Sequence, residues 1–202
     1  MTPHFIARQL AHPKGISGRI IAALMNRRNA KLNGFTVRQL DVKESDRVLE
    51  IGFGGGVALQ ELMGLAGFVC GIDRSAAMVE RAKVRWSKAV ATGAAEFQEG
   101  CVETLPFRSS SFDKVCTVNT VYFWKKLGPG FAEMYRVLSS GGRVAVGFLP
   151  KEWMDRMGMP ADIFTSRTAE EVVGVLNDVG FRDFHVKRPK PQTAWNVIVA
   201  SR

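Results

Sequence analysis

The sequence predicts an α/β fold, in which a doubly wound, mostly parallel sheet is covered by helices on both faces. From Asp46 onward, short apolar runs alternate with helical patterns, which is typical of right-handed βαβ units. A glycine-rich turn follows the first apolar run directly. The last two apolar runs are joined by a loop too short for a crossover helix, so they are expected to pair antiparallel and to close the sheet as a hairpin.

The first 45 residues are predicted to be helical and basic. Apolar residues recur at helical spacing over residues 16–25, with Ser17 as a plausible N-cap, and a second helical stretch covers residues 32–40. At 202 residues the chain has the length of one domain. We therefore expect a single domain with residues 1–45 as a helical cap over the ligand crevice and 46–202 as the α/β core.

Seven strands and four helices are expected beyond the cap. The strands are predicted at residues 47–51, 68–72, 95–98, 114–118, 143–148, 181–186 and 194–200. The helices are predicted at residues 57–65, 75–91, 130–138 and 168–179. The last helix is expected to end at Gly180, a typical C-terminal residue. The strand at 114–118 lacks alternation of polar and apolar residues, as expected of a strand buried on both faces.

Composition excludes several protein classes. The chain is 46% hydrophobic and 23% charged, which is not the composition of a disordered polyelectrolyte. Its three cysteines form no CxxC pair, so neither a disulfide framework nor a Cys-rich zinc site is expected. No apolar run reaches the roughly 20 residues that cross a bilayer. A reducing, cytoplasmic location is the expectation that follows.

The chain carries 28 basic and 19 acidic residues, a formal net charge of +9. This surplus leaves nucleic acid, an anionic membrane surface and anionic small molecules open as partners. Part of it lies in the predicted N-terminal helices, at Arg19, Arg27, Arg28 and Lys31. These side chains form either a solvated face or a peripheral contact with a membrane surface, and the sequence does not choose between the two.

The glycine-rich turn is the most informative segment. An apolar strand runs into Gly52, Gly54 and Gly56, and a helix begins directly after them. Such a turn lets the backbone approach a ligand closely, and the helix adds free N–H groups. A dinucleotide fingerprint beginning at Gly52 requires glycine where the chain has Val57, which argues against a nicotinamide-dependent oxidoreductase. Glu50 precedes the glycines and suits a cationic or amine-bearing ligand.

Asp73 ends the second predicted strand, 17 residues after Gly56. A carboxylate at about this distance from the turn receives the ribose hydroxyls of a nucleotide. Asp73 could instead only cap the next helix, a task for which Ser75 is also suited. In combination with the glycine turn, the ribose role is favoured.

At this point the residues resemble a known family. Residues 49–56 together with 71–73 resemble the first two motifs of class I S-adenosylmethionine (SAM)-dependent methyltransferases, which share a Rossmann-like seven-stranded sheet. Residues 100–107 and 111–115 resemble the branch acting on small molecules, which includes ubiquinone and menaquinone, sterol and phospholipid methyltransferases. The resemblance spans residues 46–200.

The resemblance implies SAM as cofactor and S-adenosylhomocysteine (SAH) as product, with no metal. The residues it places around the cofactor are Glu50, Gly52, Phe53, Gly54, Gly56, Asp73, Arg74, Cys101, Val102, Glu103 and Asn119. The glycines and Glu50 would hold the methionine moiety, Asp73 the ribose, and Arg74 would lie beside the adenine. The family often has an acid where this chain has Cys101, so adenine recognition is expected at Val102 and Glu103. Cys101 itself is expected to be a small buried residue.

The acceptor side is expected after the strand at 114–118. The resemblance places Asn119 at the SAM amino group, facing the acceptor. Tyr122 and Trp124 are candidate acceptor contacts, with core packing as the alternative, while Phe123 is expected to pack in the core. Candidate general bases are Tyr122, His12 and His4, none of which stands out, and His185 is expected to face solvent. No His, Asp or Glu cluster has metal-ligand spacing.

The predicted function is transfer of a methyl group from SAM by in-line displacement to a small-molecule acceptor. The acceptor would be an oxygen, nitrogen or carbon nucleophile, with a lipid or a quinone-like molecule among the options. The N-terminal helices and residues 153–160 are expected to cover the crevice. Alternatives are an RNA or protein methyltransferase and a non-catalytic SAM-binding protein. Nucleic acid is the less favoured acceptor, because the chain has neither an Asn-Pro-Pro-Tyr motif nor a Pro-Cys nucleophile.

Overall fold

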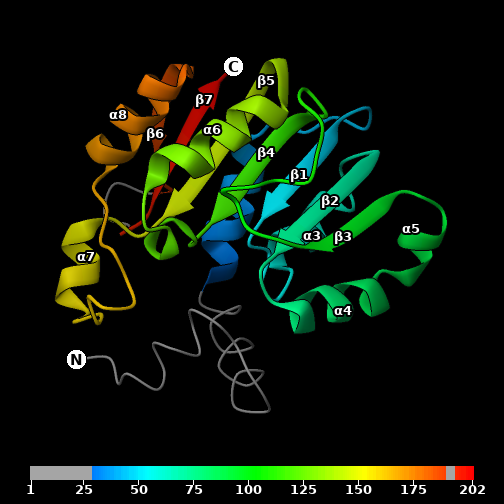
Figure 1. The fold of residues 1–202 in the computed structure, drawn as a ribbon, viewed down its shortest axis with the longest axis horizontal. Coiled ribbons are helices and arrows are strands. Elements are labelled where there is room, and N and C mark those ends of the chain that lie inside the picture. Colours follow the sequence, from blue (N-terminus) through cyan, green and yellow to red (C-terminus); the bar gives the residue numbers. More distant parts are fainter. Residues whose placement is uncertain (1–28, 190–193) are drawn as a thin grey trace.

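The computed structural model describes residues 29–189 and 194–202, and its centre is one seven-stranded sheet (Figure 1). The strand order is β3-β2-β1-β4-β5-β7-β6. The strands are β1 (Arg47–Ile51), β2 (Phe68–Asp73), β3 (Ala95–Glu99), β4 (Phe112–Val118), β5 (Leu138–Phe148), β6 (Arg182–Lys187) and β7 (Asn196–Ser201). The pairs among β1 to β5 are parallel, whereas β7 is antiparallel to both β5 and β6. The predicted sheet with its terminal hairpin is confirmed.

Helices cover both faces of the sheet, and each face has its own hydrophobic layer (Figure 1). The helices are α3 (Val57–Leu62), α4 (Ala76–Arg85), α5 (Ser87–Ala91), α6 (Leu127–Val137), α7 (Lys151–Arg156) and α8 (Ala169–Val179). Leu49 and Ile51 of β1 belong to the layer beneath α6 and α8. Val48 belongs to the opposite layer, with α3, α4 and the helical residues 29–39. Alternate residues of β1 are thus buried on opposite faces, which is how a doubly covered strand is stabilised.

Several element boundaries differ from the sequence prediction by one to three residues, and two differences are larger. The helix expected at 75–91 is two helices, α4 and α5, because the backbone leaves helical geometry at Trp86 (φ −111°, ψ 33°). The Trp86 ring lies 5.5 Å from that of Phe97 on β3, so packing against the sheet coincides with the break. Strand β5 begins at Leu138, directly after α6, rather than at residue 143, because Leu138 pairs with Phe112 at the start of β4.

A short 3-10 helix (Val121–Phe123) and α7 were not predicted. The 3-10 helix follows the carboxyl end of β4, and α7 follows that of β5. The chain after α7 contacts the 3-10 helix. The Thr165 N–H donates to the Tyr122 carbonyl at 2.9 Å. Met154 of α7 and Phe164 are buried in the same hydrophobic layer as Tyr122. Residues 153–160 therefore pack beside the turn that follows β4.

The helical residues 29–39 confirm the second predicted N-terminal helix in its main part. The first predicted helix at 16–25, the basic residues Arg19, Arg27 and Arg28, and the candidate bases His4 and His12 lie outside the described residues. Within residues 29–189 and 194–202, no helix combines the length and apolar character needed to cross a membrane.

Candidate cofactor and active site

A cavity of about 420 Å³ opens at the carboxyl ends of β1, β2 and β4. Strand β1 lies between β2 and β4, so the chain winds away from β1 in one direction through β2 and β3 and in the other through β4 and β5. In open α/β sheets the ligand crevice lies at such a reversal point. The cavity walls come from the glycine turn, the ends of β2 and β4, the loop after β3, and the helical residues 29–33.

The glycine turn after β1 has three glycines with positive φ, Gly52 (72°), Gly54 (49°) and Gly56 (73°). Gly52 and Gly54 line the cavity together with Phe53. A Cβ on Gly54 would meet no atom within 4 Å, so a side chain there would project into open space. Gly56 is not among the lining residues; it precedes α3, and a Cβ there would lie 2.6 Å from the Trp86 ring. Its role is therefore close packing rather than ligand contact.

Asp73 connects the glycine turn to the start of α4. Its Oδ2 accepts a hydrogen bond from the Gly54 N–H at 2.8 Å, and its Oδ1 accepts one from the Ser75 N–H at 2.9 Å. The Ser75 side chain, expected to cap α4, makes no capping bond, and Asp73 accepts the Ser75 N–H. Asp73 also lines the cavity. Asp73 therefore holds the residue before α4 and also lies at the ligand crevice, and its binding of ribose hydroxyls stays a prediction.

Glu50 is a buried carboxyl group in the cavity wall, with 2% of its surface exposed. Its Oε2 has no hydrogen-bond partner among the described residues. Burial, with a smaller contribution from the negative charge of Asp73, raises the pKa of Glu50 to about 8, and a backbone hydrogen bond with Leu59 offsets part of this increase. A buried, unsatisfied carboxylate is costly unless a cation or a donor approaches it. The wall is therefore suited to a positively charged ligand group.

The loop after β3 supplies Cys101, Val102 and Glu103 to the cavity. Cys101 is exposed, so the expectation of a buried residue was wrong. Only its neighbour Val102 points into the hydrophobic layer, which leaves Cys101 on the solvent side of the turn. Glu103 is exposed as well.

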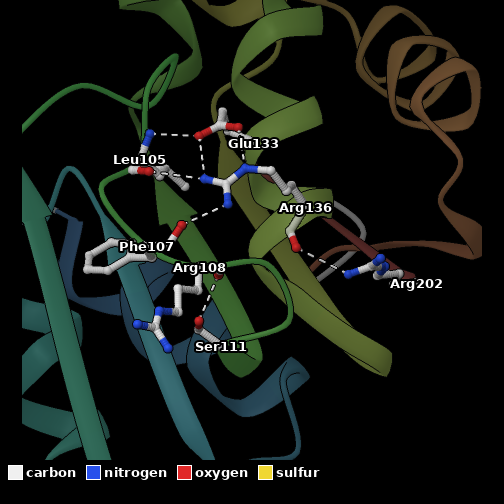
Figure 2. Close-up of polar contacts among 7 residues, drawn as sticks. All are labelled: Leu105, Phe107, Arg108, Ser111, Glu133, Arg136 and Arg202. Atoms are coloured by element: carbon white, nitrogen blue, oxygen red, sulfur yellow. Dashed lines mark hydrogen bonds and ion pairs between the residues drawn. The ribbon is translucent and has the colours of Figure 1, made fainter.

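The continuation of this loop is held in place by Arg136 of α6 (Figure 2). Its guanidinium donates to the carbonyls of Phe107 at 2.7 Å and Leu105 at 3.0 Å and forms an ion pair with Glu133 at 2.6 Å. The Leu105 N–H in turn donates to Glu133 at 2.8 Å. Because both charged groups bond the loop backbone, α6 fixes the part of the chain that follows the cavity residues.

The turn after β4 forms the opposite wall of the cavity, with Asn119, Thr120, Phe123, Trp124 and Lys125. Asn119 has a left-handed backbone (φ 58°), a conformation that asparagine tolerates better than most residues. Trp124 is 94% buried and also lines the cavity, so this residue both packs in the core and forms part of the cavity wall. The Phe123 ring packs against the hydrophobic layer, as expected, and Phe123 also lines the cavity. The Arg74 guanidinium lies 5.7 Å from the centre of that ring.

Tyr122, predicted as an acceptor contact or a general base, lies behind the cavity wall. It is buried and is not among the residues lining the cavity. Its hydroxyl donates to Asn119 Oδ1 at 2.8 Å and accepts from the Leu149 N–H at 2.5 Å. Burial raises the pKa of Tyr122, which keeps the hydroxyl protonated. His185 is exposed on β6, as predicted.

Several wall residues were missed by sequence reasoning, namely Asn29, Asn33, Met78, Thr120 and Lys125. Their positions depend on how helices pack over the strand ends, for which the sequence offers no local pattern. Residues 153–160, expected to cover the crevice, do not line it. Across residues 29–189 and 194–202 no group of three or more His, Cys, Asp or Glu side chains is placed to hold a metal.

Comparison with known proteins agrees with this geometry. A family model described as "Methyltransferase domain" matches residues 49–146. The uncharacterized methyltransferase YdaC of Bacillus subtilis is 32% identical over 184 residues, covering 88% of this chain and 93% of that protein. A ubiquinone/menaquinone biosynthesis C-methyltransferase of Geotalea daltonii is 32% identical over 115 residues, covering 55% of this chain and 49% of that protein.

A solved structure has the same fold over nearly the whole chain. The possible histamine N-methyltransferase of Thermotoga maritima, a SAM-dependent methyltransferase, has a TM-score of 0.67 at 21% identity, covering 91% of this chain and 98% of that one. The same assignment follows from the family model, from a relative that is similar over nearly its full length, and from the shared fold. The chain belongs to the class I SAM-dependent methyltransferases.

Proposed function

We propose that this methyltransferase binds SAM along the β1 and β2 side of the cavity and methylates a small molecule that enters at the β4 side. The observation that carries the cofactor placement is the buried Glu50 carboxyl group, whose Oε2 lacks a hydrogen-bond partner among the described residues. SAM carries both an ammonium group and a sulfonium, and either would offset the charge of this carboxylate. Bound SAM supplies an electrophilic methyl carbon with a neutral thioether as leaving group.

The other walls fit the remaining parts of SAM. Each carboxylate oxygen can accept two hydrogen bonds, so Asp73 can receive ribose hydroxyls while it still holds the N–H groups of Gly54 and Ser75. The open space in front of Gly54 leaves room for the methionine moiety. Arg74, Val102 and Glu103 line the same cavity and would contact the adenine, Val102 through its backbone. Cys101, a weak hydrogen-bonding residue, contributes little to this recognition.

Alignment and exclusion of water supply the catalysis in this proposal. In-line displacement requires the nucleophile, the methyl carbon and the leaving group to lie in one line, and a rigid wall provides this positioning. Asn119, Phe123, Trp124 and Lys125 form that wall. The lining residues Asn29 and Asn33 support a capping role for the helical residues 29–39.

A small acceptor is favoured by similarity to a relative. The cavity of about 420 Å³ has the size of a small-molecule pocket, which fits SAM itself. The relative from Geotalea daltonii is named for ubiquinone/menaquinone biosynthesis, which favours a quinone-like or other small acceptor over a macromolecule.

The acceptor class can be identified by labelling. SAM with an isotopically labelled methyl group is incubated with the protein and with cell extract, and the extract is separated into small-molecule, lipid, RNA and protein fractions. We expect label in the small-molecule or lipid fraction, and none with the Gly54→Val variant. Label confined to RNA or protein would overturn the proposed acceptor.

The raised pKa of Glu50 makes both the stability of the protein and its affinity for SAM depend on pH. The pKa of Glu50 is about 8 in the folded protein against 4.5 as its ordinary value. Between these values the folded state holds a proton that the unfolded state has released, so this group lowers stability as pH rises from 4.5 to 8. A cationic ligand prefers the ionised form, so SAM affinity should rise over the upper part of the same window.

Glu50→Gln removes the titrating group. Without ligand, we expect the stability of the variant to lose the decline that Glu50 causes between pH 4.5 and 8, so the variant is more stable than the parent above pH 8. We also expect the variant to bind SAM more weakly, with an affinity that does not depend on the ionisation of residue 50. Urea unfolding and calorimetry between pH 6 and 9 measure both effects. Glu99→Gln, a change at an exposed position on β3, is the matched control. A parallel pH profile for the parent and Glu50→Gln would rule out the proposed titration.

A further inference from the structure

We propose that Asn119 selects the methyl acceptor by presenting an amide N–H to it, so that the acceptor reacts through an oxygen and binds as an anion. Tyr122 acts as the positioning residue that sets this orientation. The inference rests on the proposed function, in which the acceptor enters the cavity from the β4 side. It adds the chemical class of the acceptor and the residue that recognises it.

The backbone fixes the position of Asn119. It follows directly after β4, and its N–H donates to the Gly147 carbonyl on β5 at 2.8 Å. Its φ of 58° turns the chain away from the strand direction at the cavity wall. The side chain therefore starts from a point that two neighbouring strands of the sheet hold in place.

The hydrogen bonds of Tyr122 fix the orientation of the Asn119 amide. The Leu149 N–H can only donate, so the Tyr122 oxygen is its acceptor, at 2.5 Å. The Tyr122 hydroxyl proton is then donated to Asn119, at 2.8 Å, and the receiving atom must be Oδ1. The amide nitrogen Nδ2 therefore points away from the Tyr122 hydroxyl, and among the described residues it has no hydrogen-bond partner. A pair of N–H donors is thus available at the cavity wall.

Tyr122 is itself held rigidly. Its ring lies 6.0 Å from that of Phe123 and 6.2 Å from that of Phe164, centre to centre. Its carbonyl accepts from the Thr165 N–H at 2.9 Å. Phe123 and Phe164 also contact each other, with ring centres 5.0 Å apart, so the three rings form one cluster. A buried ring in such a cluster, with polar partners at its hydroxyl and at its backbone carbonyl, has little freedom to rotate, so the Asn119 amide has one preferred orientation.

An N–H donor next to the reacting atom discriminates between nucleophiles. An oxygen anion keeps lone pairs for attack while it accepts a hydrogen bond from Nδ2, whereas a neutral amine has one lone pair, which the new bond consumes. The charged residues of the cavity wall come from different strand ends. Glu50, Asp73, Arg74 and Glu103 belong to the ends of β1 to β3, whereas Lys125 follows β4, as Asn119 does. Lys125 therefore favours an anion on the acceptor side. A phenolate or similar oxygen anion fits this wall, and an amine does not.

The reaction balances without a protein base. Donation from Asn119 Nδ2 and the positive charge of Lys125 lower the pKa of the bound acceptor. The acceptor therefore releases its proton to solvent and binds as an anion. Its oxygen then forms a bond to the methyl carbon, the carbon–sulfur bond breaks, and the electron pair of that bond stays on sulfur. Tyr122, already committed as donor and acceptor, takes no part in proton transfer.

The test uses two probes of the same shape, 4-nitrophenol and 4-nitroaniline, with SAH-saturated protein. The absorbance of bound 4-nitrophenol reports its ionisation directly. We expect the bound phenol to ionise at a lower pH than the free phenol and to bind about tenfold or more tightly than the aniline, as one hydrogen bond to a charged group implies.

Three variants and one control variant separate recognition from folding. Asn119→Gly keeps the left-handed backbone without strain and removes the amide, and Asn119→Asp keeps the shape but cannot donate when ionised. Both should lose the preference for the phenol and the shift in its ionisation. Tyr122→Phe should reduce the shift while SAH affinity is retained. Tyr135→Phe, which changes the other tyrosine at a position outside the cavity, should alter neither.

The outcomes distinguish this inference from the proposed function. If SAH binds but the parent shows no preference for the phenol, binds neither probe, or keeps its preference in both Asn119 variants, the inference is wrong and the cofactor site stands. If SAH itself does not bind, the proposed cofactor placement fails.

Discussion

Replacing Gly54 with valine is expected to abolish cofactor binding and leave the fold intact. A Cβ at this position meets no protein atom within 4 Å, so the valine side chain would occupy the cavity itself, where the methionine moiety of SAM is proposed to lie. We expect SAH affinity, measured by calorimetry, to fall by at least about a hundredfold, which corresponds to ~2.7 kcal/mol. Circular dichroism and thermal unfolding would show a folded protein.

The control for this substitution is Gly93→Val. Gly93 also has a positive φ (74°, against 49° at Gly54) and an open Cβ direction, but it lies in the exposed turn between α5 and β3. Both variants therefore introduce similar backbone strain, and only one fills the cavity. SAH affinity within threefold of the parent in Gly54→Val would contradict the placement of the cofactor.

Asp73→Ala is expected to have the second large effect, on binding and on stability together. The change removes the proposed acceptor for the ribose hydroxyls and leaves the N–H groups of Gly54 and Ser75 without their partner. Loss of a hydrogen-bonding partner for buried groups costs about 1–3 kcal/mol each. We expect a loss of SAH affinity of about a hundredfold or more in calorimetry, and a lower unfolding temperature.

Asp113→Ala separates the two effects. Asp113 also accepts a backbone hydrogen bond, from the Arg47 N–H at 2.9 Å, but it lies outside the cavity walls. Its replacement should lower stability and leave SAH affinity unchanged. If Asp73→Ala lowered stability while SAH affinity stayed at the parent value, Asp73 would be a structural residue only.

The features that the sequence predicted correctly depend on local patterns. Strand β1 begins and ends at the predicted residues, because an apolar run followed by glycine is readable in a few positions. The carboxyl-end location of Glu50, Asp73 and Asn119 then follows from parallel strands ending at one edge of the sheet.

What the sequence could not predict depends on contacts between distant segments. Tyr122 is bound to Leu149, 27 residues away, and this bond decides that its hydroxyl serves Asn119. Gly56 follows the glycine pattern of a ligand turn, yet its packing partner is Trp86, at the junction of α4 and α5. Only the folded arrangement assigns these roles.

A crystal structure of the protein with bound SAH tests the central claim most directly. We expect SAH in the cavity at the carboxyl ends of β1, β2 and β4, with the ribose hydroxyls on the Asp73 carboxylate and the ammonium group beside Glu50. SAH bound at any other surface, or in this cavity with the ribose away from Asp73, would contradict it.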